Sequence, residues 1–518
     1  MYHEIKDRCY SVEMFKSFFT KLKAFLRPKD ARLLWSLILT SLFVRLPLFF
    51  RNWSLGTDDG IYAISTRHIA KGNIPFRNVF SSQGGWFLEI QAIPVWVMRN
   101  VFFAPRIMSL LTGIAITVLV FKIASRLMTR NWAFVAGLLT SLSGTVIRTT
   151  SAITSDGMVV AFSLLCILLA LKFIEDETNK NSVYLGLALG FGCSIKSIFM
   201  IPTIIFLIVS TYKSSIRARA TAIITSLIVF ILPYILFGFK NVWNQSVAYH
   251  LDKDDPLKLK SNIAKITTTV FKFDAFLVLT LVIVILLSIF TLFKSEKPQK
   301  LNRNIKLLSF TYGLPTLLLL LFQTPLFRNH VVLIAPVAII IIAYILSEHI
   351  SLKRPEHFAF FGLIMLIPLI FSGIKLYTDS AFRKEKGYDS IEETIEAEIK
   401  PNRIMLTNDP GLAFDTHQDI PLGIEDTSKY RFLSENESLE LNEETFAKYL
   451  KNKNVCTVVL NLKTDDRQFD IEDKLADIFV WSEPSTYGRY KIWINTSEDC
   501  LKLETDFRDS GDGTGKRP

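Results

Sequence analysis

An acidic pair, Asp58-Asp59, follows the first long apolar run of the chain and precedes Tyr62. Two carboxylates held this close repel each other, and the repulsion raises the pKa of one of them. One acid could then serve as a general base while the other holds a cation or orients an acceptor. The alternative is a solvated loop acid, or an N-cap for a helix that starts near Ile61.

Three further polar positions border apolar runs, where a charge is costly and is a functional candidate by default. Asp156 could act with the acidic pair, or it could cap a helix. Lys196 could bind a phosphate, or it could extend toward lipid head groups. Arg328, followed by Asn329 and His330, could contact a phosphate or anchor a span at the interface.

The composition indicates which elements must position these residues. The chain has 518 residues, of which 50% are hydrophobic and 41 are Phe, and the apolar residues come in long blocks. This pattern excludes a disordered chain, a disulfide scaffold and an ordinary cytosolic enzyme. It predicts a polytopic α-helical membrane protein with some soluble mass attached.

The net charge of +11 divides near residue 375. Residues 1–375 hold 40 Lys and Arg against 18 Asp and Glu, whereas residues 376–518 hold 19 against 30. The basic part contains the long apolar runs and the acidic part has none, so we predict a membrane domain followed by a soluble acidic domain. The positive charge therefore does not indicate nucleic-acid binding.

A bilayer-spanning helix needs about 20 mostly apolar residues. We predict about 11 spans, at residues 33–50, 106–124, 131–147, 157–174, 183–195, 198–212, 220–239, 275–293, 307–323, 331–347 and 358–374. The stretch 86–103 is aromatic and contains Glu89 and Arg99, so we expect it to lie in the membrane interface rather than to cross the bilayer.

The distribution of Lys and Arg predicts the orientation of these spans. With the N-terminus in the cytoplasm, the inside segments carry 23 Lys and Arg in 83 residues, against 14 in 108 for the outside segments. We therefore predict a multi-pass protein of the plasma membrane. Its parts are a cytoplasmic amphipathic segment (1–32), a transmembrane domain (33–375) with an outer loop at 51–105, an extracytoplasmic α/β domain (376–509) and a disordered tail (510–518).

The acidic domain is predicted to be a small α/β fold. We expect helices at 389–400 and 442–453, strands at 403–407, 455–460 and 490–494, and a turn at 409–411. Cys456 and Cys500 could pair in an oxidising compartment, although the sequence alone does not fix their distance. No catalytic motif is evident in this domain.

The predicted topology brings acids and cations to one face of the membrane. The acids Asp58, Asp59 and Asp156 and the cations Lys196 and Arg328 all lie on the outer side. A displaced lipid phosphate needs cations to stabilise its developing charge. An incoming hydroxyl group needs a carboxylate to accept its proton. The combination predicts a reaction on a membrane-borne phosphate.

The order of the motifs points to a known family. The acidic pair and Tyr62 are followed by a turn with Gly and Pro and by the aromatic interfacial stretch, then Asp156 opens the fourth span and Lys196 follows the Gly-rich fifth. In this order and sidedness, residues 33–375 resemble the GT-C class of membrane glycosyltransferases, in the group of the protein O-mannosyltransferases and the lipid A aminoarabinose transferase.

The resemblance implies a polyprenyl-phosphate-sugar donor and an acceptor hydroxyl on a protein, lipid or glycan. It assigns Asp58 as the general base of an inverting transfer, in which Asp59 and Asp156 orient Asp58 or the acceptor. Lys196 contacts the lipid phosphate in this scheme. The candidates for binding the lipid phosphate and the sugar are Lys196, Arg328, His330, Tyr62 and Gln83.

The chain departs from the family pattern at two places. The second acid of the pair, usually Glu, is Asp59, and Ser81-Ser82-Gln83-Gly84-Gly85 replaces a segment that is acidic or Lys-Pro in some members. A metal ligand of part of the family then has no clear counterpart, so dependence on a divalent metal stays open.

Two other functions fit the same apolar bulk. A transporter or flippase of lipid-linked saccharides predicts internal repeats, but the outer loops 51–105 and 240–274 do not match as repeats would. A non-catalytic assembly subunit of the cell envelope would use the acidic domain as its binding module. A transporter would also carry charges within the membrane, so these two functions stay as alternatives to the glycosyltransferase that we predict.

Overall fold

The structure is a computed structural model of the chain. It describes residues 28–50, 57–98, 101, 103–251, 256–293, 303–350, 355–379, 386–427, 449–450, 455–461, 481–482 and 484–501. Most of the predicted segment 1–32, nearly all of the predicted helix 442–453 and the predicted tail 510–518 lie outside the described residues.

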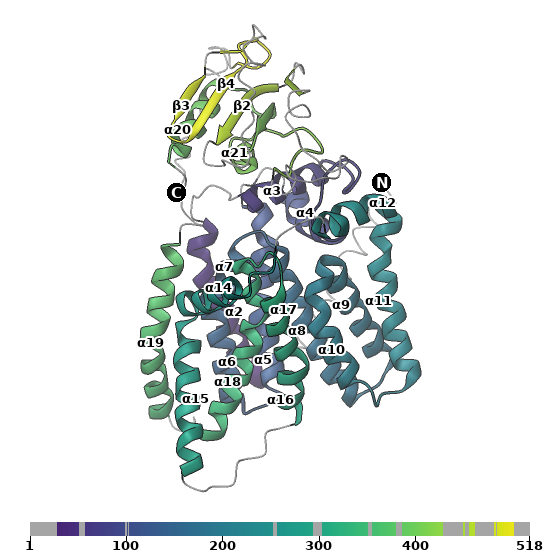
Figure 1. Cartoon of the computed structure of the whole chain (residues 1–518), viewed down its shortest axis with the longest axis vertical. Helices are drawn as coiled ribbons and strands as arrows, with labels where there is room; N and C mark the ends of the chain where they lie inside the picture. The colour runs from purple at the N-terminus through teal and green to yellow at the C-terminus, as the bar shows by residue number, and fades with distance from the viewer. Residues whose placement is uncertain are drawn as a thin grey trace.

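Helices make up most of the described residues before Thr378 (Figure 1). Those of the first half are α2 (Pro28–Phe50), α3 (Thr57–Ala70), α4 (Phe87–Met98), α5 (Ile107–Ala124), α6 (Arg130–Leu142), α7 (Gly144–Ser151), α8 (Ser155–Glu175), α9 (Asn179–Lys196), α10 (Ile201–Ser210) and α11 (Ile216–Phe237). Those of the second half are α12 (Phe239–Trp243), α13 (Tyr249–Leu251), α14 (Leu259–Phe273), α15 (Ala275–Phe293), α16 (Arg303–Leu308), α17 (Leu314–Phe322), α18 (Ala335–His349) and α19 (Pro355–Tyr377).

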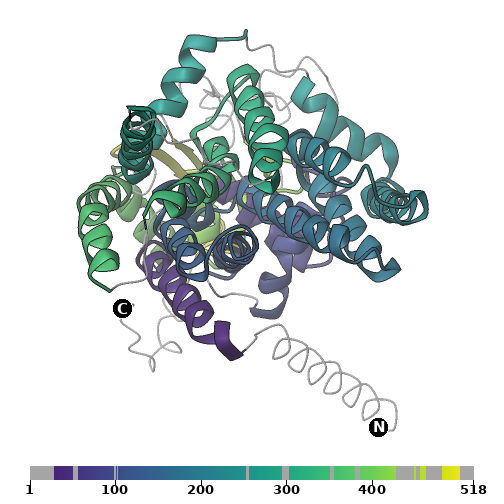
Figure 2. The same cartoon turned by 90° about the horizontal axis from the view of Figure 1, so that it is seen from below.

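The two halves of the helical part share one core. Both α2 and α18 pack on α5 and α6, so helices far apart in the sequence lie together when the bundle is seen from below (Figure 2). Phe121, Trp132 and Ile340 are among the buried side chains of this core. Packing of apolar helix faces around one core explains how loops distant in sequence reach the same end of the bundle.

The outer faces of the bundle are apolar. On α11 the exposed side chains Ile224, Ile228, Ile231 and Ile235 recur at helical spacing along one face. An apolar surface of this extent is stable next to lipid and not next to water. The chain is a multi-pass membrane protein, as predicted.

Within the described residues, seven helical segments are long and apolar enough to cross a membrane, or eight if one bent pair counts as a span. The predicted number of about 11 therefore stays a prediction. The predicted span 131–147 is divided at Ser143, where the backbone is extended and the serine Oγ caps α7 by accepting from the Val146 N–H. One of the seven segments, Asn179–Ser210, contains both α9 and α10, which we predicted as two spans.

One short helix and one bent pair of helices do not fit a simple span. Helix α4 has 12 residues and includes Glu89 and Pro94, so it is too short to cross the bilayer, as the interfacial prediction requires. The bent pair consists of α14 and the following helix, which meet at 98° next to Asp274. Figure 1 shows α3, α4 and α12 at the end of the bundle that faces the C-terminal part.

The C-terminal part contains a four-stranded sheet. Its elements are α20 (Tyr388–Glu398), β1 (Ile404–Thr407), α21 (Pro410–Asp415), β2 (Val455–Asn461), β3 (Ser485–Tyr487) and β4 (Tyr490–Ile494). The strand order is β1-β2-β4-β3, in which β1 pairs parallel to β2 and the other pairs are antiparallel. Strand β2 is buried along its whole length, as its apolar sequence predicts.

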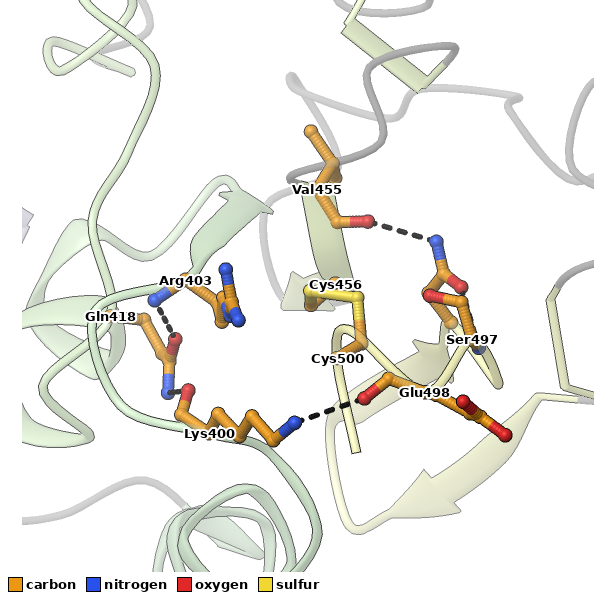
Figure 3. The surroundings of a disulfide bond; sticks show 9 residues. Lys400, Arg403, Gln418, Val455, Cys456, Ser497, Glu498 and Cys500 are labelled. Atoms are coloured by element: carbon orange, nitrogen blue, oxygen red, sulfur yellow. Dashed lines mark hydrogen bonds between the residues drawn. A yellow bond between two sulfur atoms is a disulfide. The ribbon is translucent and has the colours of Figure 1, made fainter. Parts of the chain in front are cut away.

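Two details of the C-terminal part extend the sequence prediction. The expected turn at 409–411 instead opens helix α21, because Pro410 is favoured in the first turn of a helix, where its missing N–H costs nothing. Cys456 of β2 and Cys500 form a disulfide, which answers the question of pairing (Figure 3). Nearby, the Lys400 ammonium donates to the Glu498 carbonyl at 3.0 Å.

Candidate functional site

A cavity of about 880 Å³ lies where the upper ends of the helices meet the C-terminal part. Six of the eight predicted site residues line it: Asp58, Tyr62, Gln83, Asp156, Lys196 and His330. Asp59 and Arg328 are not among the lining residues. Residues spread over more than 270 positions of sequence therefore converge on one space.

The Asp156–Lys196 ion pair forms one side of the cavity. The Lys196 Nζ lies 2.6 Å from Asp156 Oδ1, and both side chains are largely buried. Thr154 occupies the N-cap position of α8, so Asp156 in the first turn is free to pair and does not act as the cap. An acid in the first turn of α8 and a lysine in the last turn of α9 both complement the dipoles of their helices.

Close packing of α9 fixes the position of Lys196. A Cβ atom on Gly186 would lie 2.4 Å from the Ala222 carbonyl oxygen, so the small residue lets α9 approach α11 closely. At Lys196 the backbone leaves the helical conformation, with φ −158° and ψ 85°, before a short 3₁₀ turn leads into α10. The Lys196 ammonium also lies 4.3 Å from the centre of the Phe199 ring, a favourable cation–π contact.

The acidic pair is divided between two environments. Asp58 is exposed and lines the cavity, whereas Asp59 is buried. Burial raises the pKa of Asp59 to about 6, although the nearby Arg106 and the backbone N–H of Ile153 favour the ionised form. The Ile153 N–H donates to Asp59 Oδ1 at 2.6 Å, so Asp59 ties the start of α3 to the segment that leads into α8.

Tyr62 stands beside the acids. Its ring packs edge-on against Phe87 with 5.0 Å between the ring centres. Burial raises the pKa of Tyr62 well above its usual value, and the carboxylates of Asp58, Asp426 and Asp156 raise it further in that order. The tyrosine is therefore a neutral hydrogen-bonding group at neutral pH.

Residues 82–85, in the segment that departs from the family pattern, line the cavity. Ser155 donates to the Gln83 side-chain oxygen at 2.7 Å, and the Gly84 N–H donates to the Ile195 carbonyl at 3.1 Å. A Cβ atom on Gly84 would lie 1.8 Å from the Ser194 carbonyl oxygen, so only glycine fits there. Gln83 is thus held next to both Asp156 and Lys196.

The predicted stretch Arg328-Asn329-His330 begins a 3₁₀ helix, Arg328–Leu333. His330 is buried, packs edge-on against Phe199 at 4.8 Å and lines the cavity. Its Nδ1 accepts from the Phe327 N–H at 3.3 Å, which leaves Nε2 as the proton-bearing nitrogen of the neutral ring. Arg328 is exposed and does not line the cavity, so its predicted contact with phosphate is less favoured than that of His330.

Sequence reasoning missed some lining residues. Asp426 comes from the C-terminal part, in which no catalytic motif was expected, and His250 comes from α13. The acidic pair Glu425-Asp426 was the only available signal for the first. Its contact with the cavity depends on how the C-terminal part docks, which local sequence patterns do not report.

The described residues contain no group of three or more His, Cys, Asp or Glu side chains arranged to hold a metal ion. The carboxylate nearest to a cation in the cavity, Asp156, is already paired with Lys196. The donor set therefore does not match a metal centre built from these side chains alone.

Fold and cavity together define a class: a multi-pass helical membrane protein whose acids and lysine meet at one end of the bundle, beside a small α/β part. Residues 85–237 match the family model described as dolichyl-phosphate-mannose-protein mannosyltransferase. No match was found among curated proteins.

Solved structures share the fold over nearly the whole chain. The crystal structure of ArnT from Cupriavidus metallidurans bound to undecaprenyl phosphate is similar with a TM-score of 0.61 at 12% identity, over 90% of this chain and 98% of that chain. The apo structure of the same protein gives a TM-score of 0.61 at 12% identity, over 88% and 96%. The predicted GT-C fold, similar to ArnT and the protein mannosyltransferases, is confirmed.

Proposed function

We propose that the chain is a glycosyltransferase that moves a sugar from a polyprenyl-phosphate donor to an acceptor hydroxyl on the outer face of the plasma membrane. The observation that supports this most directly is the convergence of Asp58, the Asp156–Lys196 pair and His330 on one cavity. The matched family is named for a dolichyl-phosphate-mannose donor, and the similar ArnT structure holds undecaprenyl phosphate.

Asp58 acts as the general base. It is the exposed acid of the pair and lines the cavity, whereas Asp59 is buried against the backbone. The acceptor hydroxyl transfers its proton to the Asp58 carboxylate while its oxygen bonds to the anomeric carbon. The bond from that carbon to the phosphate oxygen breaks on the opposite face, so the configuration inverts and the lipid phosphate leaves with the electron pair.

Lys196 stabilises the charge that develops on the departing phosphate. Its ammonium is held by Asp156 and by the Phe199 ring, so it is oriented before the donor binds. His330 packs edge-on against the same Phe199 ring and supplies a second hydrogen-bond donor toward the phosphate. In this scheme Asp156 positions Lys196, and Asp59 positions α3, so neither needs to touch the acceptor.

The test is the turnover of undecaprenyl-phosphate sugars by the purified full chain and by Asp58→Asn. Loss of a general base is expected to lower kcat by about 10²–10⁴-fold with the thermal stability unchanged. Glu393→Gln, at an exposed acid on α20, is the matched control and should keep full activity. Turnover by folded Asp58→Asn near that of the unaltered chain would remove Asp58 from this role.

A further inference from the structure

The C-terminal part is fixed to α3 by polar contacts. The Arg67 guanidinium donates to the carbonyls of Phe414 and Gln418, each at 2.8 Å, and lies 4.0 Å from the centre of the Phe414 ring. Lys71, one turn further along, pairs with Asp419. Helix α3 thus carries the proposed base at its start and holds the C-terminal part at its end.

Backbones also meet closely at the start of α3. A Cβ atom on Gly60 would lie 2.2 Å from the Gly411 nitrogen, so the two chains touch with no space for a side chain. Gly60 directly follows the acidic pair. The docked C-terminal part therefore borders the site itself and is not confined to a distant surface.

Glu425 fixes the segment that reaches the cavity. Its carboxylate is fully buried, lies 3.0 Å from the His68 Nδ1 and accepts from the Phe80 N–H at 3.3 Å. On the other side, the Thr427 hydroxyl donates to the Asn408 carbonyl at 3.3 Å. Asp426 is therefore held between an anchor on the helical part and an anchor on the C-terminal part.

Asp426 lines the cavity beside Tyr62, on the side of the proposed base. Among the described lining residues, the only Lys or Arg is Lys196, which Asp156 engages at the other side. The aromatic side chains of Tyr234 and Tyr249 also line the cavity. Carboxylates accept hydrogen bonds from hydroxyl groups, and aromatic rings pack on the apolar faces of sugar rings.

We propose that Asp426 binds the acceptor, and that the acceptor group which enters here is a neutral sugar unit with several hydroxyls. The Asp426 carboxylate accepts a hydrogen bond from a hydroxyl next to the attacking one, and so directs the attacking oxygen toward Asp58. An anionic acceptor is disfavoured because it would meet two carboxylates. This inference rests on the proposed function, since it assumes that Asp58 is the base.

The test separates acceptor binding from donor chemistry by using water as a second acceptor. The full chain is given undecaprenyl-phosphate mannose, with or without octyl glucoside, and free mannose and mannosylated glucoside are measured. The unaltered chain should mannosylate octyl glucoside at least about tenfold faster than the matched octyl glucuronide. Asp426→Asn should lower transfer to octyl glucoside about tenfold, because the hydrogen bond loses its charged acceptor, with hydrolysis within about twofold.

Two further variants guard against a merely structural effect. Asp419→Asn removes an acid of the same interface that lies outside the cavity, and should leave the ratio of transfer to hydrolysis unchanged. Asp426→Ser should lower transfer at least as much as Asp426→Asn, and both should keep the thermal stabilisation that undecaprenyl phosphate gives.

Three results would overturn the proposal: hydrolysis without transfer to octyl glucoside by the unaltered chain, transfer by Asp426→Asn at the full rate, or an equal loss of hydrolysis and transfer in that variant. Absence of turnover by the unaltered chain with undecaprenyl-phosphate mannose and with the other undecaprenyl-phosphate sugars would instead contradict the proposed function.

Discussion

Lys196 is the cation best placed to meet a phosphate, yet it is already engaged. Its ammonium is 2.6 Å from Asp156, and an incoming phosphate must share or replace that partner. Removal of one partner of such a buried pair destabilises the protein, because the other charge is left poorly solvated. Asp156 and Lys196 should therefore affect lipid binding in opposite directions even though they form one pair.

We expect Lys196→Gln to weaken binding of undecaprenyl phosphate by about ten- to a hundredfold, the value of a hydrogen bond between charged groups. Asp156→Asn should bind the lipid phosphate at least as tightly as the unaltered chain, because Lys196 loses its competing partner, but should melt at a lower temperature. Lys265→Gln, at a lysine bonded to the Leu326 carbonyl outside the cavity, is the control. Equal affinity for Lys196→Gln and the unaltered chain, measured by native mass spectrometry, would rule out this phosphate contact.

The residue types at the site were predictable because charges next to apolar runs are rare. Asp58, Asp156, Lys196 and His330 stand out on that ground and all line the cavity. Asp426 does not stand out, since the 143 residues from 376 to 518 contain 30 acids. Local composition identifies a charge that is unusual for its surroundings, and it cannot identify a charge that becomes unusual only after docking.

At the scale of elements, α3 connects the two parts of the molecule. Its first turns carry Asp58 and Tyr62 toward the cavity, and its last turn carries Arg67 and His68 toward the C-terminal part. Burial lowers the pKa of Arg67 to about 10, so the guanidinium stays charged at neutral pH and keeps its contacts. A helix that starts near Ile61 was one of the alternatives that the sequence offered, but its contact with the C-terminal part was not expected.

Arg67→Ala should loosen the docked segment 410–427. The substitution removes two hydrogen bonds to carbonyls and a cation–π contact, together about 2–3 kcal/mol. Hydrogen exchange of the amides in 410–427 should become at least about tenfold faster, while exchange in β2 stays the same. Arg77→Ala is the matched control, since the Arg77 guanidinium donates to the Leu236 and Phe237 carbonyls of α11 and not to the segment 410–427 in the described residues. Unchanged exchange in Arg67→Ala would show that apolar packing alone holds the segment.

Helix α21 contains an acid that should make stability depend on pH. Burial raises the pKa of Asp415 to about 7, against an opposing hydrogen bond from Tyr388. The folded state then keeps a proton that the unfolded chain has released above about pH 4. This contribution to stability is therefore complete below about pH 4 and is lost as the pH rises to 7 and beyond, with a slope of up to about 1.4 kcal/mol per pH unit.

Asp415→Asn should reduce that slope. The amide oxygen can still accept from Tyr388, so the fold is expected to persist while the titrating proton is removed. Urea unfolding of the C-terminal part, followed by tryptophan fluorescence between pH 5 and 8, compares the two chains. Parallel curves for the variant and the unaltered chain would assign the pH dependence to other acids.

At the scale of the whole molecule, the helical and C-terminal parts build one cavity. A chain that lacks residues 380–518 would lose Asp426 and the contacts along α3, so its inactivity would not distinguish an enzyme from a subunit that merely binds a partner. The change in charge and the end of the long apolar runs near residue 375 predicted a helical part followed by a small α/β part, because composition is a property of whole segments. It could not predict that the parts share a site, since docking depends on tertiary contacts.

The disulfide between Cys456 and Cys500 bears on the orientation of the whole chain. Structural disulfides persist in oxidising compartments, which agrees with a C-terminal part outside the cytoplasm. The same orientation puts the loop after α8 inside. Two exposed positions test it: Glu393 on α20 and Lys180 at the start of α9.

In intact cells, a thiol reagent that does not cross membranes should label Glu393→Cys and should not label Lys180→Cys. After permeabilisation both should react, which controls for exposure of the new thiols. The disulfide should also survive until a reductant is added, so that alkylation before reduction leaves Cys456 and Cys500 unmodified. Labelling of Lys180→Cys alone in intact cells would show that the chain has the opposite orientation in the membrane. The proposed site would then face the cytoplasm, and a donor on the outer face could not reach Asp58.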